Sequence, residues 1–320
     1  MKAAMPEGLK SGIEGYLAEM AAGSLVEKSA RMSQGYRLGR GSDRSLDFGA
    51  YLVARLPATF AAAAFCLSEL GRRHPQFSPR SILDAGSGPG TAAWAATTIY
   101  QDISRVTFMD SNPRFLQLAS RLAAGSDHPA LRQAEALQAD LGNPLPQKSA
   151  DLVVAAYALA EMPLVQAGRT AMALWQACAG ALLIIEPGTP QGFARINQAR
   201  SALITAGASL VAPCTHMNAC PILKPDWCHF SVRFPRSREH MHAKQAKVPF
   251  EDEKFSYLIA SRQPCQSHGA RILASPRETK AQISFRLCAE NGLSTRDIAT
   301  RDKAEYKRVR KLAWGYVFEC

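Results

Sequence analysis

The stretch "SILDAGSGPGTAAWAA", residues 81–96, decides the fold. An apolar run of strand length leads into a glycine-rich turn, and an Ala-rich segment with high helix propensity follows. Gly86, Gly88 and Gly90 allow backbone conformations that side chains disfavour, and they let a ligand approach the backbone closely. The combination indicates a nucleotide-binding turn. On spacing alone, however, the loop also fits a nicotinamide dinucleotide site.

Acidic residues near the turn favour a positively charged ligand. Asp84 precedes the first glycine, where its carboxylate would repel a pyrophosphate and face the cationic end of a ligand. Asp110 ends the next strand, twenty residues beyond Gly90, where a carboxylate can accept hydrogen bonds from ribose hydroxyls. Asp140 follows the third strand and is suited to an adenine amine. A sulfonium nucleoside fits this set better than a dinucleotide.

Strand-like runs continue after the turn and alternate with helix-competent segments. This pattern is typical of an α/β, Rossmann-like fold with a doubly wound parallel sheet. Upstream, an Ala- and Leu-rich region predicts helices, one of which begins or kinks at Pro57. We therefore predict four regions: a helical N-terminal region at 1–78, a nucleoside-binding sheet core at 79–210, a Cys-rich insertion at 211–250, and C-terminal strands that complete the sheet, with a basic tail, at 251–320.

Composition limits the possible partners and surroundings. The 320 residues are 47% hydrophobic and carry a formal charge of +11, which predicts a folded globular protein with affinity for polyanions. The apolar runs are too short or too interrupted by charge to span a bilayer. Glu7, Glu14 and Glu19 argue against a secretory signal or an acid-poor transit peptide. We therefore expect a monomer in the cytoplasm with no membrane association.

The positive charge is concentrated in three clusters. Solvated helix faces and nucleic-acid binding explain any one cluster equally well, but three clusters without matching acidic blocks favour a nucleic acid. The clusters are Arg31, Arg37, Arg40 and Arg44; Arg233, Arg236, Arg238, Lys244 and Lys247; and Lys303, Lys307, Arg308, Arg310 and Lys311.

The segment "APCTHMNACPILKPDWCHF", residues 212–230, contains Cys214, Cys220 and Cys228. A catalytic nucleophile and simple buried thiols are alternatives, but neither explains three thiols in fifteen residues as well as a metal site does. A closed structural site requires a fourth ligand. The spacing does not separate zinc from an iron-sulfur centre. The candidates for the fourth ligand are Cys288, Cys265, His216, His229 and Cys320.

No catalytic residue can be identified from a motif. The fourth strand ends in "AAYALAEMP", which lacks the Asn/Asp-Pro-Pro-aromatic motif of nucleic-acid amino-methyltransferases. Tyr157 and Glu161 lie in this neighbourhood, but a packing aromatic and a solvated acid explain them equally well. If the bound sulfonium nucleoside is a methyl donor, methyl transfer depends mainly on positioning, so an active enzyme need not carry a catalytic signature.

Residues 81–188 resemble a class I S-adenosylmethionine-dependent methyltransferase. The resemblance implies that the turn from Asp84 to Gly90, with Ser87, cradles the methionine part of S-adenosylmethionine, and that Asp110 holds the ribose. Together with Asp140, the expected cofactor-binding residues are Asp84, Gly86, Ser87, Gly88, Gly90, Asp110 and Asp140.

A wider resemblance covers residues 45–315. The motifs "YLVARLPATFAA", "LDAGSGPGTAAWAA", "IIEPGTPQGF" and the cysteine segment are similar to the mitochondrial small-ribosomal-subunit methyltransferase-like assembly factors and their bacterial relatives. This resemblance implies a four-iron, four-sulfur (4Fe-4S) cluster on Cys214, Cys220, Cys228 and Cys288. It also implies association with small-subunit ribosomal RNA or its precursor.

The expected function is therefore S-adenosylmethionine-dependent methylation, on or with small-subunit ribosomal RNA, in ribosome assembly and translation. Two alternatives stay open: a catalytically inactive assembly factor, and a zinc-stabilised methyltransferase of another substrate. We expect the cluster to be structural and to present Arg233, Arg236 and Arg238 to phosphates.

Overall fold

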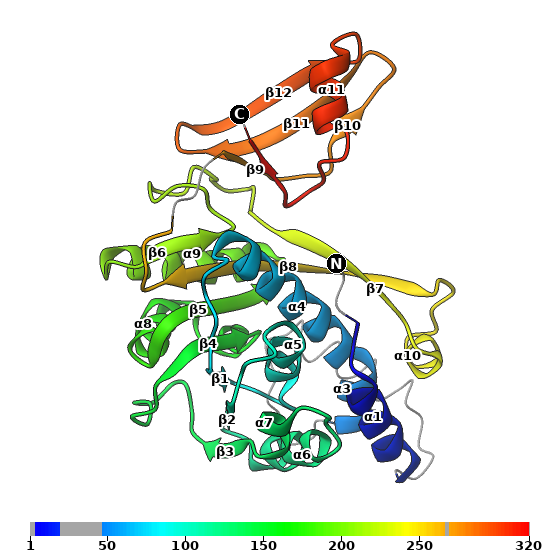
Figure 1. Cartoon of the computed structure of the whole chain (residues 1–320), viewed down its shortest axis with the longest axis vertical. Helices are drawn as coiled ribbons and strands as arrows, with labels where there is room; N and C mark the ends of the chain where they lie inside the picture. The colour runs from blue at the N-terminus through cyan, green and yellow to red at the C-terminus, as the bar shows by residue number, and fades with distance from the viewer. Residues whose placement is uncertain (1–3, 20–46, 266–268, 320) are drawn as a thin grey trace.

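The computed structural model describes residues 4–19, 47–265 and 269–319. Its largest element is a sheet of eight strands (Figure 1). The first basic cluster of the sequence, at 31–44, and Cys320 lie outside the described residues. In spatial order the large sheet runs β3 (Glu135–Gln138), β2 (Arg105–Asp110), β1 (Ser81–Ala85), β4 (Ala150–Ala156), β5 (Cys178–Pro187), β8 (Phe250–Ser261) and β6 (Ser209–Ala212), while β7 (Phe230–Pro235) pairs with β8.

The first five strands are parallel, as the alternating sequence pattern predicts. Strand β8 runs antiparallel to β5, β6 and β7, so the sheet is mixed. All five residues of β1 are buried, because helices cover both faces at the centre of the sheet. The prediction of an α/β fold is confirmed, with the antiparallel strand as the difference.

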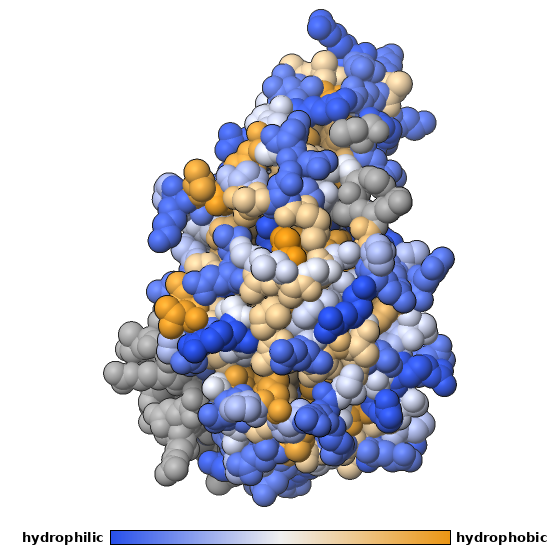
Figure 2. All heavy atoms as spheres, turned by 90° about the vertical axis from the view of Figure 1, so that its left-hand side faces the viewer, coloured by the Kyte–Doolittle hydropathy of each residue, from blue (hydrophilic) through white to orange (hydrophobic). Residues whose placement is uncertain are grey.

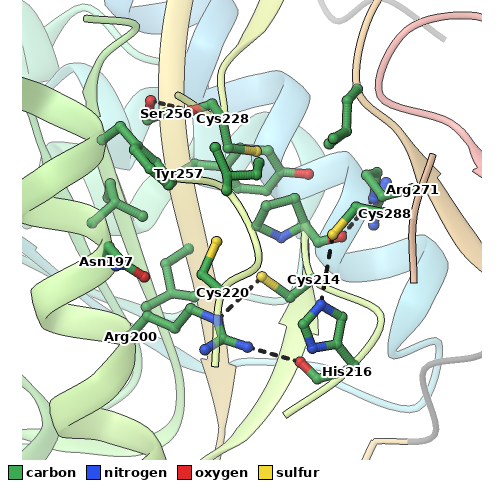
Figure 3. A pocket seen from close by; sticks show the side chains of 16 residues that line it. Asn197, Arg200, Cys214, His216, Cys220, Cys228, Ser256, Tyr257, Arg271 and Cys288 are labelled. Carbon is green, nitrogen blue, oxygen red and sulfur yellow. Dashed lines mark hydrogen bonds between the residues drawn. The ribbon is translucent and has the colours of Figure 1, made fainter. Parts of the chain in front are cut away.

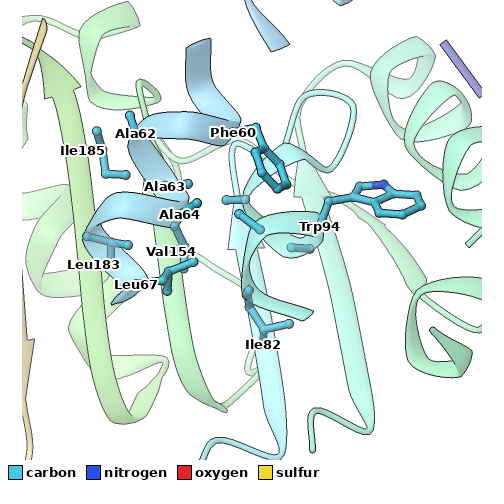
Figure 4. Close-up of a cluster of buried hydrophobic side chains, with 14 of the residues drawn as sticks. Phe60, Ala62, Ala63, Ala64, Leu67, Ile82, Trp94, Val154, Leu183 and Ile185 are labelled. Carbon is cyan, nitrogen blue, oxygen red and sulfur yellow. The ribbon is translucent and has the colours of Figure 1, made fainter. Parts of the chain in front are cut away.

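One face of the sheet packs on helices from the N-terminal half of the chain. The centre of this core is α4, whose small residues allow close contact with the strands. Ala62, Ala63 and Leu67 lie against Val154 and Leu183 (Figure 4). Helix α4 begins at Leu56 with Pro57 in its first turn, in agreement with the prediction for that proline. The helices of this face are α1 (Glu7–Glu19), α3 (Phe48–Ala54), α4 (Leu56–Arg73), α5 (Thr91–Ile99), α6 (Pro113–Ala124) and α7 (Pro129–Arg132).

The opposite face packs on α8 (Ala167–Gln176) and α9 (Pro190–Thr205). The strands alternate their side chains between the two cores: in β4, Val153 joins this core and Val154 joins the first. Two single-turn 3-10 helices, η1 (Leu159–Glu161) and η2 (Leu164–Gln166), connect β4 to α8. The short helix α10 (Arg238–Ala243) connects β7 to β8.

A second, antiparallel sheet forms a separate C-terminal lobe, residues 269–319, at one end of the long axis of the molecule (Figure 1). Among the described strands of 251–320, β8 alone joins the large sheet, which corrects the prediction that they all complete it. The reason is a small core of their own, in which Phe285 and Leu287 pack with Val309 and Phe318. The lobe contains β9 (Ala270–Ile272), β10 (Arg277–Glu278), β11 (Gln282–Ala289), β12 (Gly292–Ala299), β13 (Val317–Phe318) and α11 (Lys303–Val309).

Arg271 on β9 links the lobe to the rest of the molecule. Its side chain is buried, with Nε donating to the Pro213 carbonyl at 2.6 Å. Its Nη1 donates to Glu69 Oε2 at 3.0 Å and to the Gly315 carbonyl at 2.5 Å. One guanidinium therefore joins α4, the cysteine segment and the end of the lobe. Within the described ranges, no single helix is long and apolar enough to cross a membrane, and α3 with α4 passes that test only as a pair bent by 45°.

Candidate functional site

The glycine loop joins β1 to α5 with all three glycines in the left-handed backbone region. The φ angles are +69° at Gly86, +51° at Gly88 and +81° at Gly90, a region that side chains strongly disfavour. A Cβ at Gly86 would lie 2.6 Å from the Ala158 Cβ, and one at Gly90 would lie 2.6 Å from the Phe108 ring. Packing alone therefore requires glycine at two of the three positions.

A cavity of about 670 Å³ opens next to this loop, and we call it the glycine-loop cavity. It lies at the carboxyl ends of the parallel strands, where β1 sits between β2 and β4 and the strand order reverses. Its volume is typical of a small-molecule site. The residues of its lining that the argument below uses are Gly86, Gly88, Asp110, Asn112, Asp140, Tyr157, Arg55 and Glu253.

Asp110, the last residue of β2, is held in a fixed orientation at the cavity wall. Its Oδ2 accepts the Gly88 N–H at 2.8 Å, and its Oδ1 accepts the Asn112 N–H at 2.9 Å. Burial raises the pKa of Asp110, whereas these backbone donors lower it. Each carboxylate oxygen has a second lone pair, so Asp110 can still accept hydrogen bonds from a ligand.

A second cavity lies between the large sheet and the C-terminal lobe, and we call it the cysteine cavity (Figure 3). Cys214, Cys220 and Cys228 reach it from the segment between β6 and β7, and Cys288 reaches it from β11. Thr215 Oγ1 also donates to the Cys288 carbonyl at 3.4 Å, so the segment and the lobe are in direct contact. The four predicted ligands thus line one cavity, although sixty residues separate the last two.

Positive charge surrounds these thiols. Arg200 is buried, and its Nε donates to Cys214 Sγ at 3.3 Å while its Nη2 donates to the His216 carbonyl at 3.0 Å. Arg271 also lines this cavity, and its Nη2 is buried without a hydrogen-bond partner among the described residues. Burial, followed by the neighbouring Cys214 and Cys220, raises the pKa of Cys288 to about 12. The mutual influence of the thiols reflects how closely they are grouped.

The alternative fourth ligands are placed differently. His216 lines the cysteine cavity, with its Nε2 3.6 Å from Cys288 Sγ. Cys265 and His229 lie outside the lining, and the His229 ring stacks on Trp227 with centroids 5.3 Å apart. Within the part of the chain that the structure describes, no group of three or more His, Cys, Asp or Glu side chains is arranged to hold a metal ion. The metal-binding role of the insertion therefore stays a prediction.

Comparison with known families covers almost the whole chain. The family described as "Mitochondrial small ribosomal subunit Rsm22" matches residues 45–319. The chain belongs to the Rsm22 family. The resemblance to mitochondrial small-subunit assembly factors is thereby confirmed, and an α/β class I methyltransferase-like fold with a mixed sheet agrees with the observed strand order.

Curated relatives of this Rsm22 family chain are longer than it is. "Ribosome assembly protein METTL17, mitochondrial" of Homo sapiens is 28% identical over 283 residues, which cover 83% of this chain and 61% of the human protein. "Rsm22-cox11 tandem protein 2, mitochondrial" of Schizosaccharomyces pombe is 25% identical over 322 aligned positions, which cover 84% of this chain and 42% of that protein. The chain therefore spans about half the length of the curated relatives it matches.

The expectation of a cytoplasmic location is contradicted by these findings. The Rsm22 family description and the names of the human and yeast relatives all contain the word "mitochondrial". The expectation rested on acidic residues such as Glu7 and Glu14, and the charge of one short segment does not determine the compartment.

Two solved methyltransferase structures that match this chain have low sequence identity to it. Magnesium protoporphyrin IX methyltransferase from Synechocystis, with bound SAH, has a TM-score of 0.44 and 14% identity, and the match covers 74% of this chain and 99% of that one. The S-adenosylmethionine-dependent methyltransferase SibL in its apo form has a TM-score of 0.42 and 17% identity, with coverage of 80% and 74%.

Three predicted cofactor-binding residues of the Rsm22 family chain lie outside the lining of the glycine-loop cavity. Asp84 is buried and its Oδ2 accepts the Ala93 N–H at 2.9 Å, so it fastens the start of α5 to β1. Burial, with a smaller contribution from the Asp110 charge, raises its pKa to about 7. Ser87 is buried as well, and Gly90 begins α5 against Phe108. These residues build the loop, whereas Gly86, Gly88, Asp110 and Asp140 border the cavity.

A polar group also lines this cavity, and two of its three members, Arg55 and Glu253, were not revealed by any sequence motif. The Tyr157 hydroxyl donates to Glu253 Oε1 at 2.8 Å, and Arg55 Nη2 lies 3.4 Å from the same oxygen. The Arg55 guanidinium also lies 5.3 Å from the centre of the Tyr157 ring. Tyr157 has a φ of +62°, a strained conformation that is enriched at functional sites. Arg55 is a charged residue within an otherwise apolar helical stretch, and this was the sequence feature that could have indicated the polar group.

The second basic cluster is less available to phosphates than the sequence suggests. Arg233 makes a bidentate contact with Asp252, at 2.7 Å and 2.8 Å, and Arg236 lies 3.2 Å from Glu251. Lys244 lies 2.7 Å from the same glutamate. The acids belong to β8, which pairs with β7, so the neighbouring strand supplies the neutralising charge. The expectation that Arg233 and Arg236 are presented to phosphates is therefore not supported.

Proposed function

We propose that this chain binds S-adenosylmethionine in the glycine-loop cavity and acts with small-subunit ribosomal RNA in ribosome assembly. We also propose that it carries a structural 4Fe-4S cluster in the cysteine cavity. The single observation that carries the first part is the Asp110 carboxylate, oriented by two backbone N–H groups at the wall of a cavity of about 670 Å³. The reaction class is methyl transfer.

The residues around Asp110 suit a nucleoside. The free lone pairs of Asp110 can accept the two ribose hydroxyls, and the carboxylate needs no reorganisation to do so. Asp140 is held by the Gly142 N–H at 2.8 Å and can accept an adenine amine. When bound, S-adenosylmethionine supplies a methyl group on a positively charged sulfur. The contribution of the protein is mainly to hold this donor and an acceptor in line.

Association with the ribosome is proposed from the family. The family description names the mitochondrial small ribosomal subunit, and the human relative is named a ribosome assembly protein. A formal charge of +11 is compatible with an RNA partner. Because the chain spans only part of its relatives, the activity and partners of the complete relatives are proposals for this chain.

The chemistry of the cysteine cavity fits an iron-sulfur cluster. Among the described residues, its lining has four thiols and no carboxylate, and thiolates are the ligands that iron-sulfur clusters require. The guanidinium groups of Arg200 and Arg271 can offset the negative charge of a thiolate-bound cluster, and Arg271 Nη2 is buried without a partner among the described residues. Ligands on both sides of the cavity would hold the C-terminal lobe against the large sheet. Zinc on the same thiols is the alternative.

The donor site is tested by Asp110→Asn, with Asp102→Asn as the matched control. Asp102 is an exposed aspartate at the opposite end of the sheet, 3.7 Å from Arg80. We expect Asp110→Asn to weaken S-adenosylmethionine binding at least tenfold in calorimetric titration, because hydrogen bonds to a charged group contribute about 1.5–3 kcal/mol each. Asp102→Asn should bind as the wild type does. Equal affinity of the two variants would refute the proposed ribose contact.

The same variant distinguishes an enzyme from an assembly factor without catalysis. Cells that contain only the Asp110→Asn protein should accumulate immature small-subunit RNA if methyl transfer is required. Normal maturation with a variant that has lost donor binding would contradict the enzymatic function and favour the inactive assembly factor.

A further inference from the structure

The C-terminal lobe carries exposed basic side chains that form no ion pair with the described carboxylates. Seven of its basic side chains are exposed and have no ion pair among the described residues, in contrast to Arg233, Arg236 and Lys244 near β8. The face of the molecule in Figure 2 shows mainly hydrophilic residues at this end. The seven side chains are Arg277, Lys280, Arg301, Lys303, Lys307, Arg310 and Lys311.

The fold brings these residues together from two separate segments. The Thr300 N–H and hydroxyl donate to the Ala281 carbonyl at 2.8 Å and the Lys280 carbonyl at 3.1 Å. The turn between β10 and β11 therefore adjoins the turn that begins α11. On α11, Lys303 and Lys307 are four residues apart and lie on one face of the helix. The positive charges of both segments consequently lie at one end of the lobe.

The acidic residues nearby are already engaged. The Asp302 side chain accepts the Glu305 N–H at 3.3 Å and caps α11. Glu305 in turn lies 2.6 Å from Arg296 and 3.7 Å from Arg308, and Glu278 accepts the hydroxyl of Tyr306. The remaining acids of the lobe are Glu290, Asp297 and Glu319. They do not outweigh the seven unpaired cations, so this end of the lobe has an excess of positive charge.

We propose that this surface, α11 with its flanking residues 301–302 and 310–311 and the segment 277–281, binds the phosphate backbone of folded RNA. The inference rests on the proposed function and assigns its RNA contact to this lobe. Lysine and arginine side chains without fixed partners contact phosphates and set orientation, but they do not read base sequence. An anionic membrane is the less suitable partner, because the buried residue of α11, Val309, packs into the core of the lobe and leaves no apolar helix face to insert.

The test compares two triple variants of the full chain. Lys303→Gln/Lys307→Gln/Arg310→Gln removes charge from the surface, and Arg105→Gln/Arg169→Gln/Lys254→Gln removes three exposed cations from the large domain. Binding to a transcript of small-subunit ribosomal RNA is measured as a function of KCl concentration. We expect the first variant to bind at least tenfold more weakly than the second. Its slope of log K against log salt should be shallower by about 2–3, because each lost phosphate contact contributes about 0.7–0.9.

The outcomes separate the two proposals. If the wild type binds the transcript and both triple variants lose affinity equally, the assignment to the lobe is wrong and the proposed function stands. If the wild type does not bind the transcript even at low salt, both proposals are wrong. Stronger binding of the wild type to vesicles of anionic phospholipid than to RNA, with loss in the first variant, would overturn the RNA assignment in favour of a membrane surface. Equal thermal unfolding midpoints confirm that both variants are folded.

Discussion

The two cavities of this molecule are assembled in different ways. The glycine-loop cavity takes much of its wall from the ends of neighbouring parallel strands, as at Gly86 and Asp110. The cysteine cavity takes its wall from α9, β8, the segment before β7, and two strands of the C-terminal lobe. Arg200 and Cys288 in this wall are eighty-eight residues apart. The first can be inferred from local order along the chain. The second exists only when distant segments are brought together.

This difference has an energetic consequence. Substitutions at Asp110 or Asp140 change one wall of a cavity whose sheet is held by two large hydrophobic cores. Substitutions in the cysteine cavity act at the junction between two sheets. Arg271 and Cys288 are on the lobe side of that junction. We therefore expect substitutions of these residues to affect the stability of the protein more than its affinity for S-adenosylmethionine.

The largest effect is expected from Arg271→Met. The substitution would remove the Arg271 guanidinium from the buried carboxylate of Glu69. It would also remove the N–H groups that donate to the carbonyls of Pro213 and Gly315. Breaking a buried ion pair typically costs about 3–5 kcal/mol. We expect a loss of this size in urea unfolding. The control is Arg277→Met, an exposed arginine of the same lobe, which should change stability by less than about 0.5 kcal/mol. Similar losses in both variants would show that Arg271 is not the link.

The next effect concerns Asp84, which lies beneath the glycine loop. Its pKa in the folded protein is about 7, above the ordinary value, because it is buried. The protonated form is therefore favoured by folding: its stabilising contribution is complete below about pH 4 and is lost as the pH rises to about 7. In unfolding experiments between pH 4 and pH 7, the contribution of Asp84 to the free energy of unfolding should fall by at most about 1.4 kcal/mol per pH unit.

Asp84→Asn should remove that part of the pH dependence, because the amide has no charge to bury. The control is Asp127→Asn, an exposed aspartate, which should keep the wild-type profile. A profile for Asp84→Asn that still falls as steeply as the wild type would show that another group is responsible.

How much could be read from sequence differed between the cavities. The positions of the strand before Gly86 and of the two carboxylates were predictable. Asp110 and Asp140 each lie at or just after a strand end, and Asp110 is at a short spacing from the glycine loop. Cys288 was reached through the family resemblance, and nothing in its local sequence points to the other thiols. The roles of Arg271 and Glu253 depend on partners far along the chain, so no local pattern could reveal them.

Charge was the least reliable guide. Arg233 belongs to a basic run in the sequence, yet Asp252 on the paired strand neutralises it. Lys303 and Lys307, in the last basic run, have no ion pair among the described residues. Asp84 was expected to face the ligand, but its side chain is buried and accepts the Ala93 N–H, so it stabilises the glycine loop. Partner strands and burial, rather than residue type, decide what a charged side chain does.

The smallest effect is expected on the affinity of the glycine-loop cavity when a residue of the cysteine cavity is changed. Cys288→Ser removes a thiol from the junction but leaves the ends of β1 and β2 unchanged. We expect the affinity for S-adenosylmethionine to change by less than about threefold, while amide exchange in 269–319 increases. Cys178→Ser, a buried thiol outside the cysteine cavity, is the control and should leave exchange in the lobe as it is. A large loss of donor affinity in Cys288→Ser alone would show that the two sites are coupled.

Iron and acid-labile sulfide analysis of anaerobically purified protein tests the central claim most directly. The wild type and Asp110→Asn should each contain about four iron and four sulfide per chain, and Cys288→Ser should have lost most of both. A colourless wild type with stoichiometric zinc, or equal iron in Cys288→Ser and the wild type, would contradict the account of the cysteine cavity as a cluster site that joins two sheets.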